Sequence, residues 1–532
     1  MKPSGLYRLI FLTVLIAYAL YCAVFIYKTS FVVEGERHFV LFDDAMISMR
    51  YAANLARGYG LVWNPGAERV EGYTNPLWVV YMAFFHLFPI PAAKISLFIQ
   101  ASGALFLIAN LFYVRRLAEV LSARLLMGIL AVVLAAFYTP LNNWGLLGME
   151  VSLLTLMLSA SLWLLLHEQK EGRFTAHAYL ILGVSTLVRL DMAVPYLVTL
   201  AFFFLTDRSN RRQHLLWGIG VLAVFLLGQS AFRLMYYGEL LPNTYYLKMA
   251  GYPLDLRVAR GLYVLFQFIW KFNWVLFLMP FLALIFRHER HMVLLVLVFV
   301  GQVAYSVYVG GDAWEHRGGS NRYISIVMPV WFLLFAYVAD SLFGAIINRL
   351  EGWPAWRERL ANVGLSVFVL ASMVNFNLLV DFKSLERWVL LRQPAFVEGN
   401  KEDVRIALEV RKITRPQASI AVVTAGAIPY FSDRPAIDLL GKSDAHIARG
   451  EVRGAGGLLD LENYRPGHMK WDYAYSIGRL KPDVVVQLWN SPEEAQLYLD
   501  QYYVIGGAGG ELAFSLRRDS PNILWDKVHL LP

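Results

Sequence analysis

Residues 9–27, LIFLTVLIAYALYCAVFIY, form a long apolar run without a single charged side chain. About 20 such residues are needed to cross the hydrocarbon core of a bilayer. Lys2 and Arg8 precede the run, as in a secretory signal, but the run is longer than a signal core and no small-x-small cleavage site follows. The stretch predicts a retained membrane anchor whose N-terminus lies in the cytoplasm.

The composition of the whole chain indicates a polytopic membrane protein. Apolar residues make up 58% of the 532 residues and charged residues only 17%, and the mean hydropathy is +0.48. Ordinary soluble domains contain roughly 45–50% apolar and about 25% charged residues. The net charge of +8 resides largely in short loops between apolar runs, which is typical of topology signals and argues against nucleic-acid binding. Cys22 is the sole cysteine, so neither an intrachain disulfide nor a cysteine metal site is expected.

Ten further apolar runs bring the number of predicted spans to eleven. The short, Pro-bounded segment 77–91 is interpreted as an interfacial or half-inserted helix, because counting it as a span would invert the charge balance of every later loop. The ten runs are 95–114, 124–140, 149–166, 177–190, 192–206, 214–236, 262–286, 291–309, 323–344 and 361–381.

The basic residues sort these loops into two sides. With eleven spans, the short Arg- and Lys-rich loops all fall on one side, which the positive-inside rule assigns to the cytoplasm. The long first loop, residues 28–76, and the C-terminal part then lie on the extracytoplasmic side. We therefore predict a membrane-embedded catalytic domain at 1–383 and an extracytoplasmic soluble α/β domain at 384–532. Charges are frequent in the second domain. Its pattern predicts strands at 419–423, 483–488 and 511–516 and a helix at 402–412.

The first loop carries the densest polar chemistry of the chain. Asp43 and Asp44 directly follow the first span and begin a stretch, 44–57, with the spacing of an amphipathic helix. One aspartate could simply cap that helix, which would leave the other unexplained. A carboxylate at the membrane edge is suited to accept a proton from a hydroxyl nucleophile. Alternatively, the pair could bind a divalent cation, since hard cations prefer carboxylate oxygens.

Further polar residues interrupt apolar surroundings on the same predicted side, and each also has a structural explanation. Arg189 and Asp191 could form an internal ion pair. Lys248 could snorkel among interfacial tyrosines. The charges of the Gly-rich stretch 310–319 could belong to a surface turn, and His316 next to acidic residues is not a specific metal signal. Together, however, aspartates and several cations facing one cavity suit a reaction with an anionic leaving group, and lipid-linked phosphate is the obvious candidate.

Several of these motifs resemble one known family. The run Asp43-Asp44-Ala-x-Ile-Ser-x-Arg-Tyr-Ala-x-Asn-Leu and the later Glu71-Gly-Tyr-Thr-Asn75 are similar to the GT-C-fold membrane glycosyltransferases related to the terminal arabinofuranosyltransferase of mycobacterial cell walls. The resemblance continues downstream and departs from the family pattern at 312–317, where the loop is longer than expected. The downstream motifs are Arg189-x-Asp191, Leu241-Pro-Asn243-Thr-Tyr-Tyr246-x-Lys248, Gly310-Gly311-Asp312, Ile437-Asp438-Leu439-x-Gly441 and Pro466-Gly467-His468-x-Lys470.

The resemblance implies an inverting transfer of a sugar, arabinofuranose first, from a polyprenyl-phosphate donor to a hydroxyl acceptor outside the cytoplasm of a bacterium, in its cytoplasmic (inner) membrane. Asp44 is favoured as the base and Asp43 as its partner or as an ion ligand. No cofactor is implied as required, and a divalent cation at Asp43 and Asp44 is kept as an alternative. The acceptor, which is a glycan, a lipopolysaccharide or a pilin-like protein, stays open. Donor phosphate would be held by Lys248, Arg189, Arg317 and Arg322, and sugar or acceptor by Glu71, Tyr73, Asn75, Asp191, Asn243, Tyr246, Asp312 and His316.

Two other classes of protein fit some of these features. A transporter or flippase for a lipid-linked sugar would need similar cations, but the sequence shows no repeat between its halves, which many transporter folds carry. A membrane-anchored binding protein in which only 384–532 functions would leave the polar motifs among the spans unexplained.

Overall fold

The computed structural model describes residues 5–286, 290–312, 319–348, 356–379, 382–454 and 460–531. The chain forms two compact units, each built from segments that are distant in sequence. The first unit contains Met1–Lys28, Gln100–Gly228 and Val258–Ala395; the second contains Thr29–Ile99, Gln229–Arg257 and Phe396–Pro532. The second unit therefore combines the C-terminal part with the first loop and with the segment that precedes α12. The predicted domain boundary at 383/384 stays a prediction.

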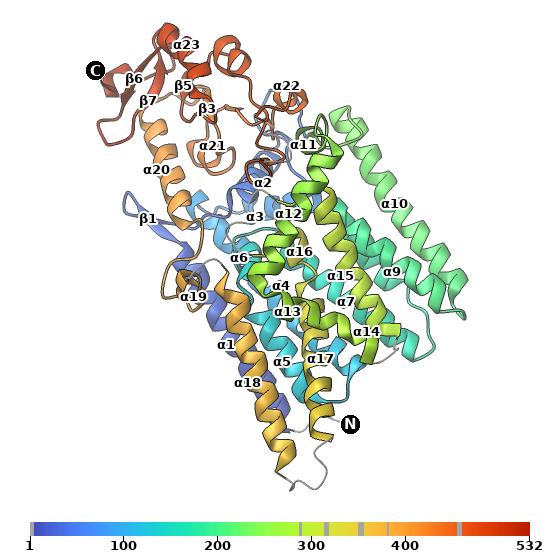
Figure 1. The fold of residues 1–532 in the computed structure, drawn as a ribbon. Helices are drawn as coiled ribbons and strands as arrows, with labels where there is room; N and C mark the ends of the chain where they lie inside the picture. Colours follow the sequence, from blue (N-terminus) through green and yellow to red (C-terminus); the bar gives the residue numbers. More distant parts are fainter. Residues whose placement is uncertain are drawn as a thin grey trace. The chain divides into compact units, whose positions relative to one another are not determined.

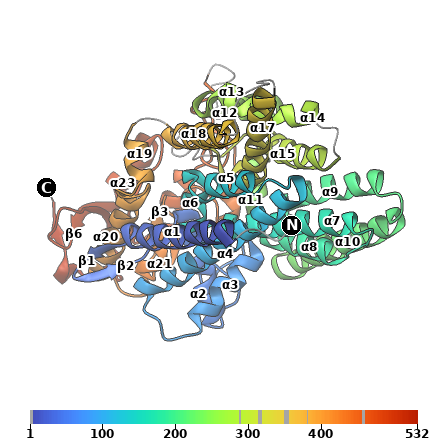
Figure 2. The ribbon, with the colours of Figure 1, turned by 90° about the horizontal axis from the view of Figure 1, so that it is seen from below.

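The first unit is helical, and its helices are long and apolar. Figure 1 shows α5, α17 and α18 running alongside one another, and Figure 2 shows α7, α8 and α9 side by side. The helices that lie wholly or largely in this unit are α1 (Gly5–Thr29), α4 (Ala92–Leu121), α5 (Leu125–Ala136), α6 (Thr139–Leu146), α7 (Val151–Lys170), α8 (His177–Val188), α9 (Ala193–Thr206), α10 (Arg211–Tyr237), α12 (Leu254–Phe272), α13 (Trp274–Leu278), α14 (Ala283–Phe286), α15 (Arg290–Tyr308), α16 (Arg322–Ser325), α17 (Met328–Asn348), α18 (Arg357–Leu378) and α19 (Phe382–Trp388).

Within the described residues, seven helices are long and apolar enough to cross a membrane, and two bent helix pairs raise the number to nine. The seven are α1, α4, α7, α10, α15, α17 and α18. Each of the eleven predicted spans corresponds to a helix or a bent pair. The two predicted at 177–190 and 192–206 are the shorter helices α8 and α9, and 77–91 coincides with the short apolar helix α3 (Pro76–His86).

The two bends have local causes. Between α5 and α6 the axis turns by 55°, and Pro140 in the first turn of α6 cannot donate a backbone hydrogen bond. Between α12 and the helices that follow, the axis turns by 107° at Asn273, which has a φ of 77°. The Asn273 side chain accepts hydrogen bonds from the backbone of Val275 and Leu276, so it starts the next helix in a new direction.

The second unit contains the α/β domain predicted for the C-terminal part. Its six-stranded sheet has the order β4-β3-β5-β7-β6-β8, in which β4, β3 and β5 are parallel and the remaining pairs antiparallel. The strands are β3 (Ile420–Val422), β4 (Ala436–Asp438), β5 (Val484–Val485), β6 (Tyr503–Gly507), β7 (Phe514–Arg517) and β8 (His529–Leu530), and the helices are α20 (Val397–Ile413), α21 (Ala427–Ser432), α22 (Ala445–Arg449) and α23 (Pro492–Tyr502). The predicted strands and helix of this part are thus confirmed, although β4, β6 and β8 had not been expected.

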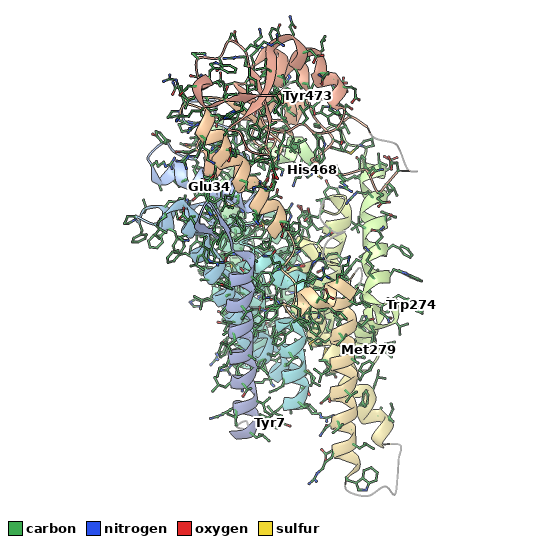
Figure 3. The ribbon with its side chains drawn as sticks, turned by 90° about the vertical axis from the view of Figure 1, so that its left-hand side faces the viewer. Tyr7, Glu34, Trp274, Met279, His468 and Tyr473 are labelled. Carbon is green, nitrogen blue, oxygen red and sulfur yellow. The ribbon has the colours of Figure 1, made fainter. Side chains whose placement is uncertain are left out.

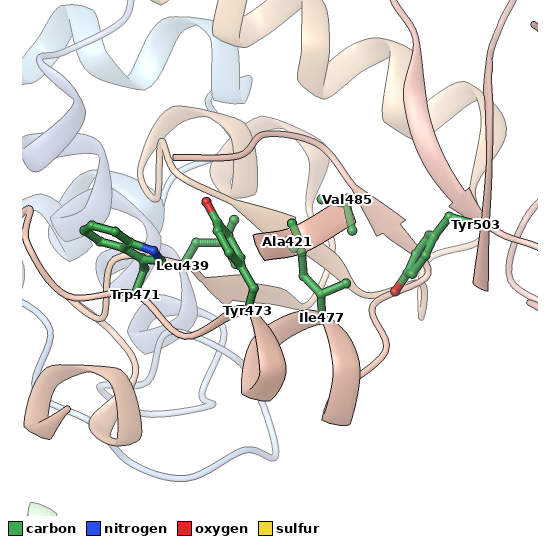
Figure 4. Packing of buried hydrophobic residues seen from close by; sticks show 8 residues of the cluster. Ala421, Leu439, Trp471, Tyr473, Ile477, Val485 and Tyr503 are labelled. Carbon is green, nitrogen blue, oxygen red and sulfur yellow. The ribbon is translucent and has the colours of Figure 1, made fainter. Parts of the chain in front are cut away.

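One face of this sheet is covered by aromatic and aliphatic side chains (Figure 4). Tyr473 and Ile477 come from the short π-helix Ala474–Arg479 before β5, with Tyr473 as its N-cap, and pack on Ala421 of β3 and Val485 of β5. Burial of such side chains contributes roughly 1.5–3 kcal/mol each to folding. The cluster fixes the sheet from which the loop after β4 projects.

The first loop completes the second unit. It contains a short hairpin, β1 (Phe31–Val33) with β2 (Glu36–His38), followed by α2 (Asp43–Ala56) and α3, and α11 (Asn243–Lys248) joins it from the middle of the chain. The predicted helix at 44–57 is confirmed as α2, but it is not half exposed: every residue from Ala45 to Asn54 is buried. The guanidinium of Arg50 explains much of this, since it donates to the backbone oxygens of Trp63, Pro429 and Arg434.

Candidate active site

The two aspartates occupy the first turn of α2, but neither caps that helix. Its N-cap is Phe42, without a side-chain hydrogen bond. Oδ1 of Asp43 instead accepts the backbone N–H groups of Gly426 at 3.1 Å and Ala427 at 2.9 Å, at the start of α21. A Cβ on Gly426 would lie 2.1 Å from the backbone oxygen of Asp43, so glycine is required for this approach. Asp43 therefore caps a helix of the C-terminal part.

Burial changes the acidity of this carboxyl. It raises the pKa of Asp43 to about 6, an effect that Lys442 and the two amide donors oppose and that the neighbouring Asp44 reinforces. Asp43 thus changes its charge close to neutral pH, which suits a group that acts in proton chemistry.

Asp44 forms an ion pair with a lysine that the sequence analysis did not select. Nζ of Lys442 lies 2.8 Å from Oδ1 of Asp44, and the lysine is only 7% exposed. Burial alone would lower the pKa of Lys442, but Asp44 and Asp43 outweigh burial and raise it. The ammonium is therefore charged and held beside both aspartates.

A tightly folded loop carries this lysine. Asp438, the last residue of β4, accepts the backbone N–H groups of Leu440 and Gly441 on Oδ1 and that of Ser443 on Oδ2. Gly441 has a φ of 76°, which favours glycine. The predicted site residue Asn243, in the first turn of α11, donates to the backbone oxygens of Gly441 and Lys442 at 2.9 and 3.0 Å. Asn243 is thus a scaffold residue of the loop in this structure.

Lys248 ends α11 and lies against Gly467, where a Cβ would come within 3.0 Å of the lysine Cγ. The charges of Lys248 and Lys442 both act on the next residue, His468 (labelled in Figure 3). Burial, with the ammonium groups of Lys442 and Lys248, lowers the pKa of His468 to about 3, whereas Asp44 opposes this shift. The imidazole is neutral at physiological pH, so the positive charges of Lys442, Lys248 and Arg465 and the carboxylate of Asp44 act on a neutral ring.

Lys470 holds the segment that carries Lys248. Its fully buried ammonium donates to the backbone oxygens of Tyr246, Ala250 and Ala448 at 3.0, 2.9 and 2.8 Å. It thereby joins the end of α11 to α22. Lys470 belongs to a motif quoted from the sequence, but its contacts assign it to positioning.

A third carboxylate approaches Asp43 from α20. Burial and then the charge of Asp43 raise the pKa of Asp403 well above its usual range, and a hydrogen bond with Thr424 opposes them. The helical pattern at 402–412 was recognised in the sequence, but nothing in it distinguished Asp403 from a surface acid.

Glu71 and Tyr73 are buried in polar contacts with α10. Nε of Arg233 lies 3.1 and 2.8 Å from the two carboxylate oxygens of Glu71. The hydroxyl of Tyr73 lies 2.8 Å from that of Tyr237. These two predicted sugar ligands have protein partners, and their role in binding stays a prediction.

The remaining predicted ligands of this unit also contact protein groups. Asn75 is buried at the start of α3 and accepts a hydrogen bond from Ser48 of α2 at 2.9 Å. Tyr246 donates to Glu239 at 3.0 Å, and the guanidinium of Arg449 lies 4.2 Å from the centre of its ring.

Arg189, Asp191, Asp312 and Arg322 lie in the first unit, where they form two buried ion pairs. Arg189 has an extended backbone conformation directly after α8. Its Nε donates a hydrogen bond to Oδ1 of Asp191 at 2.7 Å. Its Nη1 also lies 3.3 Å from Glu150. Arg322 lies 2.8 Å from Asp312. Both guanidinium groups thus have carboxylate partners, as in the internal ion pair considered from the sequence.

Tyr323 lies between these ion pairs, with the Arg189 guanidinium 4.8 Å and the Arg322 guanidinium 5.8 Å from the ring centre. His316 and Arg317 lie outside the described residues. Asp43, Asp44, Lys248 and Asn243 thus gather in the second unit, and Arg189, Asp191, Asp312 and Arg322 gather in the first.

The surroundings of the aspartate pair bear on the possible divalent cation. Across the ranges that the structure describes, no group of three or more His, Cys, Asp or Glu side chains is arranged to hold a metal ion. At the aspartate pair, backbone amides contact Asp43 and an ammonium contacts Asp44.

Comparison with known proteins adds one partial family match. Residues 394–521 match a family described as a domain of unknown function, DUF8728. No curated protein matches the chain significantly. The match covers the sheet domain that carries Lys442.

Solved structures of similar fold cover nearly the whole chain at low identity. ArnT from Cupriavidus metallidurans in the apo state has a TM-score of 0.59 at 14% identity, over 95% of this chain and 97% of ArnT. ArnT bound to undecaprenyl phosphate has a TM-score of 0.58 at 12% identity, over 96% and 98%. The oligosaccharyltransferase AglB from Archaeoglobus fulgidus, in complex with an inhibitory peptide and a dolichol-phosphate, has a TM-score of 0.53 at 12% identity, over 99% of this chain and 76% of AglB. The chain is thus a polytopic membrane protein of the GT-C fold with a C-terminal α/β domain.

Proposed function

We propose that this protein is an inverting membrane glycosyltransferase that moves a sugar from a polyprenyl-phosphate donor to a hydroxyl acceptor. The observation that carries the proposal is the ion pair between Asp44 and the buried Lys442, beside Asp43 and Lys248. Such a site offers a base for a hydroxyl and positive charge for a phosphate. The fold neighbours support the donor class, because one is bound to undecaprenyl phosphate and another to a dolichol-phosphate.

In the proposed reaction, Asp44 accepts the proton of the acceptor hydroxyl. The freed oxygen attacks the anomeric carbon from the side opposite the phosphate, and the lipid phosphate leaves, which inverts the configuration. Because Oδ1 of Asp43 accepts two backbone hydrogen bonds, we assign Asp43 to orienting the start of α2 and Asp44 to the proton transfer. Lys248 binds the donor phosphate at the end of α11.

The finer assignments follow the family resemblance. Arabinofuranose is the first donor sugar to test, the acceptor is a glycan, lipopolysaccharide or pilin-like protein, and the reaction takes place outside the cytoplasm at a bacterial inner membrane. Loop charges support this orientation. A reporter fused at Lys170 that reads extracytoplasmic would overturn it.

Purified protein in nanodiscs, incubated with a panel of polyprenyl-phosphate sugars and candidate acceptors, tests the activity directly. We expect one donor to yield lipid phosphate and a glycoside of inverted configuration, and Asp44→Asn to abolish both. Movement of intact donor across a proteoliposome bilayer without cleavage would identify a flippase instead. Binding without turnover or transport by wild-type protein would contradict the enzyme assignment.

A further inference from the structure

The loop between β4 and α22 brings a buried lysine to the aspartate pair from the domain of unknown function. This loop, residues 438–443, lies within the matched domain and forms an ion pair with Asp44, at 2.8 Å between Nζ of Lys442 and Oδ1. Nothing in the comparisons assigns a role in catalysis to the domain.

The loop is built to keep the lysine in place. Asp438 fixes its backbone from within through three amide hydrogen bonds, and Asn243 fixes it from α11. The first loop fixes it from the other side, because Gly72 packs so closely that a Cβ there would lie 2.9 Å from the backbone oxygen of Lys442 and 2.4 Å from Oγ of Ser443. Three segments of the second unit thus hold one ammonium, which is the arrangement expected of a preorganised charge.

A buried lysine held this way is costly unless its charge is used or neutralised. Lys442 is 7% exposed and its ammonium is neutralised by Asp44. Removal of one partner from a buried pair leaves an uncompensated charge. Any event that neutralises Asp44 therefore makes the charge of Lys442 available to a new anion.

We propose that Lys442 is a catalytic residue that passes its positive charge from Asp44 to the departing lipid phosphate during sugar transfer. This inference rests on the proposed function and assigns the α/β domain a direct part in the chemistry.

The charges balance in one step. The hydroxyl proton moves to Asp44, the hydroxyl oxygen bonds to the anomeric carbon, and the bond between that carbon and the phosphate oxygen breaks with its electron pair. Asp44 loses one negative charge as the phosphate changes from a monoanionic diester to a dianionic monoester. Lys442 loses an anionic partner and gains another in the same step, so the site keeps its net charge.

The neighbouring residues fit this exchange. His468, which faces both Lys442 and Lys248, has a pKa lowered to about 3 by burial and by these and the Arg465 cations, so it adds no positive charge of its own. Because Lys442 already has a partner in the resting enzyme, it contributes little to binding of the donor. Donor binding is assigned to Lys248, at the end of α11, under the proposed function.

A purely structural ion pair between α2 and the loop is the competing explanation. Kinetics separate the two, because a tether affects folding, whereas charge exchange affects the transition state alone. We expect Lys442→Met to lower kcat by about 10²–10³-fold while the donor KM changes less than about threefold, and Lys442→Arg to restore part of kcat. Lys248→Met should show the opposite pattern, with a raised donor KM.

The matched control is Asn64→Ala. Asn64 also ties the first loop to the sheet domain, through hydrogen bonds with the backbone of Ala436 at 2.7 and 3.0 Å, but it carries no charge to the site. We expect this variant to lose thermal stability and keep kcat. Equal loss of kcat in Asn64→Ala and Lys442→Met would overturn the proposal in favour of a tether.

The pH profile gives a second readout that does not depend on stability. Lys442 lowers the pKa of Asp43, whereas burial and Asp44 raise it and Asp403 also faces it. In Lys442→Gln the acid limb of the rate should therefore move to a higher pH than in wild type. An unmoved limb, or a kcat within threefold of wild type in Lys442→Met and Lys442→Gln, would overturn the proposal. Failure of wild-type protein to turn over any donor would instead contradict the proposed function.

Discussion

Asp43 accepts a hydrogen bond from the backbone N–H of Ala427 at 2.9 Å across 384 positions of sequence. The first turn of α2 is thereby joined to the start of α21, and the aspartate that might have capped its own helix caps another. The aspartate pair is consequently held by the C-terminal part as much as by the first loop.

The cap predicts different effects for two substitutions of Asp43. Asp43→Ala removes the acceptor of two buried amides and should lower the free energy of unfolding by about 1–2 kcal/mol. Asp43→Asn keeps an oxygen acceptor and should lower it much less. Thermal unfolding in detergent measures both; equal destabilisation by Ala and Asn would show that charge, not capping, matters.

The raised pKa of Asp43 predicts a pH dependence. The charge of Asp43 helps to hold Lys442 in its charged form beside Asp44, and Asp43 becomes protonated below its pKa of about 6, so the reaction rate should fall as the pH drops through about 6. The effect of pH on stability has the opposite direction. Because the pKa of Asp43 in the folded protein lies above its ordinary value of 3.8, the stability that this group contributes declines as the pH rises from about 3.8 to about 6. Asp43→Asn should lack both transitions, and a wild-type rate that is flat from pH 5 to 8 would contradict the assignment.

The three hydrogen bonds of Lys470 predict that replacing this residue will affect both folding and donor binding. Lys470→Met leaves three backbone oxygens without their donor and should destabilise the protein by about 3 kcal/mol. Because two of these oxygens flank Lys248, the donor KM should also rise. Lys470→Arg, which keeps the charge, serves as the control, and an unchanged KM in folded Lys470→Met would exclude the positioning role.

The pair of Glu71 and Arg233 predicts a double-mutant result. Either single change to Met leaves a buried charge unpaired and should cost about 3–5 kcal/mol. The double variant should recover most of that stability. Activity measured in the double variant then tests the predicted sugar contact: a folded but inactive protein would assign Glu71 to the substrate, and an active one to the scaffold.

Removal of divalent cations is expected to leave the rate unchanged. The proposed reaction takes its positive charge from Lys442 and Lys248, and an oxygen of Asp44 already contacts an ammonium. Activity should therefore persist in excess chelator. Loss of activity that Mg²⁺ or Mn²⁺ restores would favour the alternative in which Asp43 and Asp44 bind a cation.

Much of the fold could be predicted from the sequence, because each helix is marked by the pattern of its own residues. Apolar runs such as 9–27 coincide with helices, and the helix after the aspartates begins at Asp43. The apolar run at 262–286 hides a 107° bend, since Asn273 adopts a positive φ that hydropathy does not report.

Only part of the candidate site could be predicted from the sequence, because its contacts join segments that are far apart in the chain. The aspartate pair is distinctive by itself, but Lys442 lies 398 positions away in an ordinary loop. Asp403 shares its helix with three other acids, Glu398, Glu402 and Glu409, none of which is buried. Contacts of this kind depend on how distant segments pack, and one sequence contains no record of that packing.

The interleaved second unit also sets the order in which the protein becomes competent. Asp44 leaves the ribosome 398 residues before Lys442, and α11, with Lys248, emerges between them. During all of that synthesis the carboxylate lacks its counter-charge. A nascent chain therefore holds an incomplete site until the segment that contains Lys442 has been synthesised.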